Sequence, residues 1–183
     1  MFKINDVLVY GTQGVCKIVD IEEKSVSGTK KKYYVLRPID EKGPTIFAPV
    51  DNEYVLKKMR KLLTKKEIDS LIDSMPDKDP TWISNENERK EQYKSIIASG
   101  DHLELIMLIK SLYAHKKARE ADGRRLHMSD ERFFKEAEQL LYDEFQYVLK
   151  LHNKDDLMKY ILARIVKKSS TIVPFRPLDV LSK

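Results

Sequence analysis

Short runs of apolar residues separated by turn residues dominate the first 50 positions of the chain. Four runs rich in valine, isoleucine, tyrosine and phenylalanine lie at residues 7–10, 15–21, 32–37 and 45–50. β-branched and aromatic runs bounded by glycine, asparagine, aspartate or proline are typical of strands. The segment 25–29, with Gly28, carries a hairpin signal. Four or five short strands at this spacing predict a small barrel of the SH3 or Tudor type rather than a βαβ unit.

From residue 54 onward the apolar residues recur at three- and four-residue steps, which is the period of helices. Thr64 and Glu67 form a capping-box pattern that opens the first clear helix. Pro76 and Pro80 bound a break after it. Further helices are expected at residues 86–98, 103–113, from 129 onward, and from 153 to 165. The 103–113 segment is apolar nearly all round, which indicates the centre of a bundle.

These patterns predict an α+β protein in which a small Tudor- or SH3-like β-barrel precedes an all-helical bundle. We expect the barrel at residues 1–55, the helical domain at residues 56–166, and a loosely ordered tail at residues 167–183. A barrel of about 50 residues has a marginal core, so we expect it to lean on the segment that follows.

Composition narrows the class of protein. Hydrophobic residues make up 42% of the chain and charged residues 34%, and the net charge is +5, which favours nucleic acid or acidic protein as partner. The single cysteine, Cys16, lies in a strand-like run and is expected to be a small buried hydrophobe. The N-terminus has no signal-peptide pattern and the chain has no run of about 18 apolar residues, so the expected location is cytoplasmic, with no membrane contact.

No pattern of catalytic residues is present in the sequence. It has no Gly-rich phosphate loop, no His-Glu-x-x-His and no nucleophile elbow. The histidines are spread over four predicted elements or boundaries, where solvated or cap positions are expected: His102, His115, His127 and His152. The sequence therefore predicts a protein that is not an enzyme and holds neither a metal nor another cofactor.

The segment from Lys110 to Arg125 has six basic and two acidic residues and spans a helix end and the following loop. A solvated helix end explains it equally well, because cations suit the C-terminal end of a helix. The functional alternative is an edge that contacts DNA phosphates without reading sequence. The candidate contacts in this segment are Lys116, Lys117, Arg119, Arg124 and Arg125.

The only tryptophan, Trp82, follows Pro80 at the boundary between the two halves. Such a side chain is either a core plug or a group presented to a partner. Arg89 and Lys90 follow it, interleaved with glutamates. Apolar side chains held beside basic residues often act as wedges in the DNA minor groove. We therefore include Trp82, Arg89 and Lys90 among the candidate DNA-binding residues.

The order of several motifs resembles the CarD/CdnL family of bacterial RNA polymerase-binding transcription regulators. The resemblance extends over residues 1–165 and lies in residues 2–15, 48–50, Trp82, 98–101, 112–117 and 129–132. It implies that the barrel is a Tudor-like domain shared with the polymerase-interacting domain of transcription-repair coupling factors. Such a barrel docks on the β subunit of RNA polymerase, partly by strand pairing.

The resemblance also implies roles for individual residues. In the barrel it points to Lys24, Ile46 and Phe47 as polymerase contacts, with Phe47 at a position where some relatives carry arginine. In the helical domain it points to Trp82 in the minor groove at the upstream edge of the promoter bubble, and to Arg132 as a further DNA contact. The implied protein is a monomer that stabilises the open complex without sequence specificity.

Two other functions remain open from the sequence. One is an adaptor whose helical domain binds another protein, with Trp82 in the core and no DNA contact. The other is a small metal-dependent hydrolase, which would require a bound metal ion.

Overall fold

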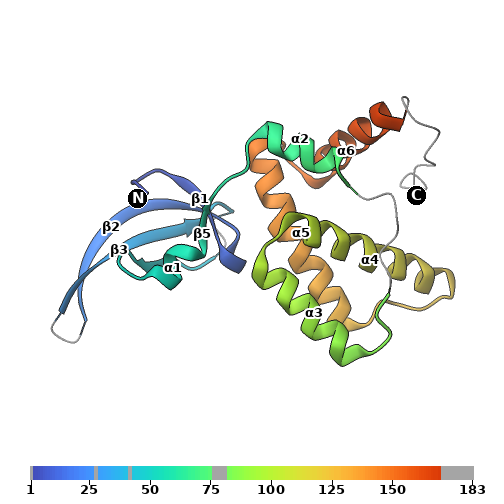
Figure 1. Cartoon of the computed structure of the whole chain (residues 1–183), viewed down its shortest axis with the longest axis horizontal. Coiled ribbons are helices and arrows are strands. Elements are labelled where there is room, and N and C mark those ends of the chain that lie inside the picture. The colour runs from blue at the N-terminus through green and yellow to red at the C-terminus, as the bar shows by residue number, and fades with distance from the viewer. Residues whose placement is uncertain (1, 27–28, 41–42, 76–81, 170–183) are drawn as a thin grey trace.

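The computed structural model describes residues 2–26, 29–40, 43–75 and 82–169. An antiparallel sheet and a group of helices lie next to each other along the long axis of the molecule (Figure 1). This is the α+β arrangement of a small barrel followed by a helical domain that the sequence predicts. Among the described residues, no helix is both long and apolar enough to cross a membrane.

The sheet contains five strands in the order β4-β3-β2-β1-β5, and every pairing is antiparallel. The strands are β1 (Val7–Tyr10), β2 (Val15–Val26), β3 (Thr29–Pro38), β4 (Ile46–Pro49) and β5 (Met59–Lys61). A short 3-10 helix, η1 (Gly11–Gln13), joins β1 to β2, and helix α1 (Glu53–Lys57) joins β4 to β5. The four predicted strands are therefore confirmed.

Buried and exposed side chains alternate along parts of these strands, and the buried ones form the core of the barrel. Leu8 pairs with Cys16, and Ile18 pairs with Leu36, and none of the four is exposed. Side chains at such paired positions point to the same face of the sheet. Cys16 is thus the buried small hydrophobe that the sequence predicts.

The fifth strand lies beyond the boundary expected at residue 55. Strand β5 pairs with β1, so the sheet continues to Lys61, and the backbone N–H of Gly11 donates to the carbonyl of Lys58. Three residues are too short to show a strand alternation, and the preceding helix α1 suits the helical period expected there. The sequence pattern therefore gave no indication of β5, which lies in a segment that we assigned to the helical domain.

The helical domain consists of α2 (Lys65–Asp73), α3 (Glu86–Ser99), α4 (His102–Ala121), α5 (Met128–Leu149) and α6 (Lys154–Ser169). The capping box of Thr64 and Glu67 is present, which confirms the predicted start of α2. Asp101 caps α4 by accepting the N–H of Glu104. Helix α4 continues well past the predicted end at residue 113 because residues 114–121 are good helix formers.

Two apolar clusters hold these helices together. One joins α3, α4 and α5 and includes Leu112, Phe133 and Ala137. The other joins α2, α5 and α6 and includes Phe145 and Leu157. Helix α5 contributes to both clusters, so it is the central element of the domain.

Three predictions fall wholly or partly outside the described residues. The tip of the hairpin at 27–28 and the proline break at 76–80 lie outside them. Of the tail expected from residue 167, the first three residues belong to α6, which ends at Ser169, and the rest lies outside the described part of the chain.

Candidate nucleic-acid interface and barrel edge

Trp82 lies just before α3 and is partly buried against the cluster formed by α3, α4 and α5. Its indole stacks on the imidazole of His115 in α4, with ring centroids 3.5 Å apart and planes 10° apart. The guanidinium carbon of Arg89 lies 4.6 Å from the centre of the indole. The side chain is therefore held in a defined place at the rim of the core, with part of its surface accessible.

Arg89 supports this site from inside the domain. Its side chain is only 7% exposed and forms a two-point ion pair with Asp130, through Nε–Oδ1 at 3.1 Å and Nη2–Oδ2 at 3.0 Å. Its Nη1 donates to the carbonyl of Ile83, 2.9 Å away, next to Trp82. This burial contradicts the expected phosphate contact, because the guanidinium has no free face to offer to DNA.

His115 is a residue of this site that the sequence did not indicate. Burial and the nearby charge of Arg119 lower the pKa of its imidazole, so the ring that stacks on Trp82 is neutral at neutral pH. His102 lies at the start of α4, which is one of the cap positions expected, but its contacts with Arg60 and Glu144 were not indicated by the sequence. In both cases the partner lies far away in sequence.

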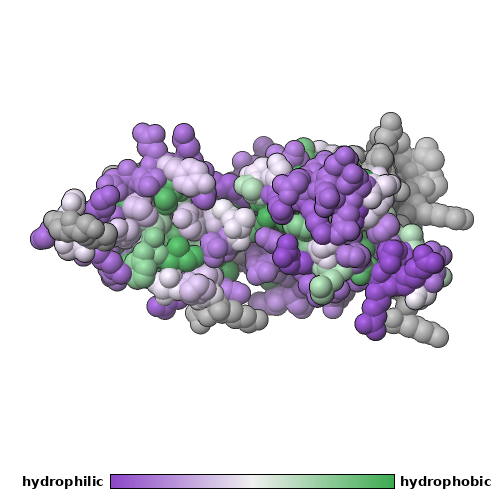
Figure 2. Space-filling view, turned by 90° about the horizontal axis from the view of Figure 1, so that it is seen from below, coloured by the Kyte–Doolittle hydropathy of each residue, from purple (hydrophilic) through white to green (hydrophobic). Residues whose placement is uncertain are grey.

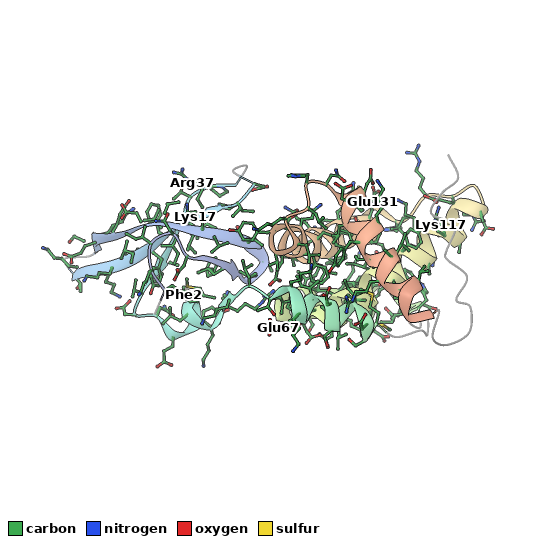
Figure 3. The ribbon with its side chains drawn as sticks, turned by 90° about the horizontal axis from the view of Figure 1, so that it is seen from above. Phe2, Lys17, Arg37, Glu67, Lys117 and Glu131 are labelled. Atoms are coloured by element: carbon green, nitrogen blue, oxygen red, sulfur yellow. The ribbon has the colours of Figure 1, made fainter. Side chains whose placement is uncertain are left out.

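The other predicted DNA-binding residues of the α4–α5 region gather at one end of the helical domain. Helices α4 and α5 pack against each other, so the end of α4, the loop after it and the start of α5 are neighbours. We call their cationic residues the basic edge: Lys116, Lys117, Arg119, Arg124, Arg125 and Arg132. Figure 3 labels Lys117 and Glu131 at this end, away from the barrel residues Phe2, Lys17 and Arg37.

The loop of the basic edge is folded tightly rather than extended. Gly123 adopts a positive φ of 70°, which favours glycine, and the N–H of Arg124 donates to the carbonyl of Arg119. The Nε of Arg119 donates in turn to the carbonyl of Arg125 at 2.6 Å. Arg124 and Arg125 are exposed, so the loop presents their charges to solvent.

Contacts in the helical domain bring Trp82 to the basic edge. His115, on which the indole stacks, directly precedes Lys116, and Asp130, which holds Arg89, lies in the first turn of α5 near Arg132. Lys90 is close to Trp82 in sequence but forms an ion pair with Glu86. Figure 2 shows hydrophilic residues gathered at the end of the helical domain that is far from the barrel.

Met128 is a second apolar residue at this end that the sequence did not indicate. It is the first residue of α5 and is 85% exposed; Arg125 precedes it by three residues and Arg132 follows it by four. In the sequence, only its place at the start of a helix could have indicated it, and an apolar residue there is ordinarily assigned to packing. Trp82 and Met128 therefore both offer apolar surface beside the basic edge.

On the barrel, β4 is the last strand of the sheet, so its outer edge has no partner strand among the described residues. The N–H of Val50 donates to Lys32 on β3, and Ala48 pairs with Tyr34 in the same phase. In an antiparallel ladder the intervening residue, Phe47, then directs its N–H and C=O away from β3. Among the described residues, the backbone N–H and C=O of Phe47 on the outer edge of β4 therefore have no strand partner.

The predicted polymerase-binding residues meet at this strand. The Nζ of Lys24 lies 3.1 Å from the centre of the Phe47 ring, and Phe47 is 42% exposed. Ile46 is partly buried against the barrel core, as the alternation of the strand requires. Lys24 and Phe47 therefore form the exposed part of this edge, and Ile46 supports it from beneath.

The described parts of the chain contain no group of three or more histidine, cysteine, aspartate or glutamate side chains placed to hold a metal ion. The structure thus offers no positive observation for the metal-dependent hydrolase that the sequence left open.

Residues 2–63 match the family model of the CarD-like/TRCF RID domain. The match begins before β1 and ends after β5, so it covers the whole sheet, including the strand beyond residue 55. This family is defined by a domain for protein interaction rather than for catalysis. Residues 2–63 therefore form a domain similar to the CarD-like/TRCF RID domain, and this similarity supports a transcription-associated role in binding RNA polymerase.

Proposed function

We propose that this protein is a transcription regulator that binds the β subunit of RNA polymerase through its barrel and stabilises the open promoter complex through Trp82. The observation that carries the proposal is the match of the barrel to an RNA polymerase-interacting domain. The helical domain adds a partly accessible indole beside a basic edge. No sequence-specific contact is expected, because the proposed contacts are to phosphates and to distorted base steps.

The two domains have different tasks in this proposal. The barrel holds the helical domain near promoter DNA at high effective concentration, so weak binding to DNA is sufficient. The basic edge supplies phosphate contacts, and the indole supplies a surface that fits unstacked DNA better than closed duplex. The open complex is then favoured only by the difference between the two affinities.

Replacing Trp82 by alanine is expected to shorten the lifetime of the open complex about tenfold, since a preference of about 1.4 kcal/mol would be lost. Polymerase binding should be unchanged because the barrel is intact. The measurement is the decay of open complexes after addition of a competitor, with the protein saturating the polymerase. Tyr147→Ala is the matched control, because Tyr147 is an exposed aromatic residue near the other end of α5.

Unchanged open-complex lifetime with Trp82→Ala, while the variant still binds polymerase, would refute the role of the indole. It would favour the adaptor, in which the helical domain binds another protein. A loss of lifetime with Tyr147→Ala as well would show that the assay reports general damage to the helical domain.

Strand pairing by β4 makes a separate prediction for polymerase affinity. Phe47→Pro removes the outward N–H and leaves the bonds of β4 to β3 in place, because proline is tolerated on an edge strand. Phe47→Ala removes the same ring but keeps the N–H. Loss of one backbone hydrogen bond should make Phe47→Pro bind about fivefold more weakly than Phe47→Ala. Equal affinities of the two variants in a titration with polymerase would exclude pairing at this position.

A further inference from the structure

A cluster of hydrogen bonds around Glu144 joins the barrel to the helical domain. The carboxylate lies on α5 and has no solvent exposure. Arg60, on the last strand of the barrel, donates to it with both terminal nitrogens, Nη1–Oε1 and Nη2–Oε2, each at 2.8 Å. The backbone N–H of Leu63, in the connection between β5 and α2, donates to Oε1 at 2.9 Å. We call this set, with His102, the Glu144 cluster.

His102 completes the cluster from the first residue of α4. Its Nε2 lies 3.0 Å from Oε2 of Glu144 and 3.2 Å from Nη2 of Arg60. When Nε2 carries the proton it donates to the carboxylate, which then accepts four hydrogen bonds. A buried carboxylate with four hydrogen bonds requires its partners in one geometry. Losing any of them leaves the desolvation penalty of the buried charge without full compensation.

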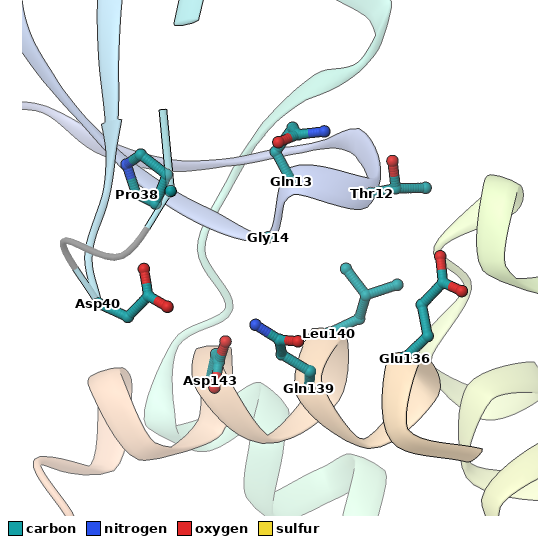
Figure 4. A pocket seen from close by; sticks show the side chains of 10 residues that line it. Thr12, Gln13, Gly14, Pro38, Asp40, Glu136, Gln139, Leu140 and Asp143 are labelled. Atoms are coloured by element: carbon teal, nitrogen blue, oxygen red, sulfur yellow. The ribbon is translucent and has the colours of Figure 1, made fainter. Parts of the chain in front are cut away.

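Elsewhere the two domains meet where η1 contacts α3 and where β2 contacts α5. A cavity of about 260 Å³ separates the barrel from α5, and mostly polar residues line it (Figure 4). The barrel side contributes Gln13 and Asp40, and α5 contributes Glu136 and Gln139. A contact interrupted by a cavity buries less apolar surface than a closely packed one. Domains joined by such contacts are expected to move relative to each other unless something else holds them.

We propose that the Glu144 cluster is an orientation lock, in which Arg60 and His102 act through Glu144 to hold the barrel and the helical domain at one angle. Arg60 is the decisive residue because it alone brings a barrel side chain to the carboxylate. In the connection between β5 and α2, Leu63 adds one main-chain bond to the carboxylate and packs its side chain against the cluster of α2, α5 and α6, but it does not belong to a barrel strand. When a partner protein holds the barrel, the lock therefore fixes where the helical domain places Trp82.

The lock is tested by the distribution of distances between spin labels on the two domains. Lys17→Cys and Lys117→Cys place the labels on exposed positions of the barrel and of α4 (Figure 3). The native thiol does not interfere, because burial and the nearby Asp40 raise the pKa of Cys16 to about 11. The variants compared are Arg60→Ala, Arg60→Lys, and Arg60→Ala with Glu144→Gln.

One narrow distribution is expected with the native cluster, and one about twofold broader with Arg60→Ala. Arg60→Lys should be intermediate, because lysine keeps the charge but loses the two-point geometry. The double variant leaves no unpaired charge buried, so it is expected to fold. Circular dichroism checks that it does, and a broad distribution in the folded double variant then reports loss of orientation rather than loss of folding. A distribution that stays narrow in the folded double variant would overturn the lock.

The effect on transcription rests on the proposed function and is measured separately. With the lock broken, polymerase binding should be kept while the open-complex lifetime falls toward that of Trp82→Ala. If Trp82→Ala itself leaves the lifetime unchanged, the proposed function fails, and the distance distributions still decide the lock. A broad distribution together with a native lifetime would overturn the claim that the lock directs Trp82.

Discussion

Replacing Arg89 by alanine is expected to lower the free energy of unfolding of the helical domain by about 3–5 kcal/mol, because it leaves the carboxylate of Asp130 buried without its partner. Asp130 is only 1% exposed, so water cannot compensate. The bond from Arg89 to the carbonyl of Ile83 is lost at the same time, which frees the segment that carries Trp82. Urea unfolding followed by circular dichroism measures the first effect, and fluorescence of Trp82, the only tryptophan, measures the second.

The matched control lies on the same helix. Lys94 forms an ion pair with Glu91 in which both side chains are exposed, and Lys94→Ala should change stability by less than about 0.5 kcal/mol. Adding Asp130→Asn to Arg89→Ala should recover part of the loss, because no unpaired charge then remains buried. If Arg89→Ala unfolded at the same urea concentration as Lys94→Ala, the buried pair would have no structural role.

Arg89 also shows why the charge of a residue is not enough to predict its role. In sequence it stands among lysines and glutamates downstream of Trp82, where a solvated or phosphate-binding role is equally reasonable. Its real partner, Asp130, is 41 residues away and belongs to a helix start, where an aspartate needs no other explanation. Burial of an ion pair depends on packing between α3 and α5, and no local pattern contains that information.

Local signals, by contrast, predicted the starts of the helices well. Thr64 with Glu67, and Asp101 with Glu104, identify helix starts because a cap involves only residues within one turn. Strand β5 was missed for the opposite reason. Its identity depends on pairing with β1, about 50 residues earlier, and its three residues have no pattern of their own.

The candidate site follows the same division. Trp82 and the basic edge could be predicted from residue type and from the resemblance, but their supports could not. His115 and Met128 become informative only when α4, α5 and the segment before α3 come together. His102 is similar, since its contacts with Arg60 and Glu144 span 42 residues on either side. Side chains that position a site are thus harder to predict than those that form its surface.

Lowering the pH is expected to reduce the stability that the Glu144 cluster contributes, and Glu144→Gln allows this contribution to be measured separately. Burial alone would raise the pKa of Glu144, but hydrogen bonds from Arg60, His102 and Leu63, with the charge of Arg60, outweigh it and hold the pKa at about 2, against 4.5 for an ordinary glutamate. A depressed pKa contributes stability above pH 4.5 and loses it as the pH falls toward 2. The full contribution is about 3 kcal/mol, and a substantial part of it is lost by pH 3.5.

The measurement is the difference in unfolding free energy between the native chain and Glu144→Gln at several pH values. Glutamine does not titrate, so any constant cost of the substitution cancels, and the difference should shrink steadily below pH 4.5. Glu91→Gln is the control for the change of side chain, because Glu91 is exposed and its pair with Lys94 lies at the surface. A difference between native chain and Glu144→Gln that stays constant from pH 7 to pH 3.5 would mean that the carboxylate gains nothing from Arg60 in the folded state. The orientation of the domains would then have to come from other contacts, such as those of η1 with α3 and of β2 with α5.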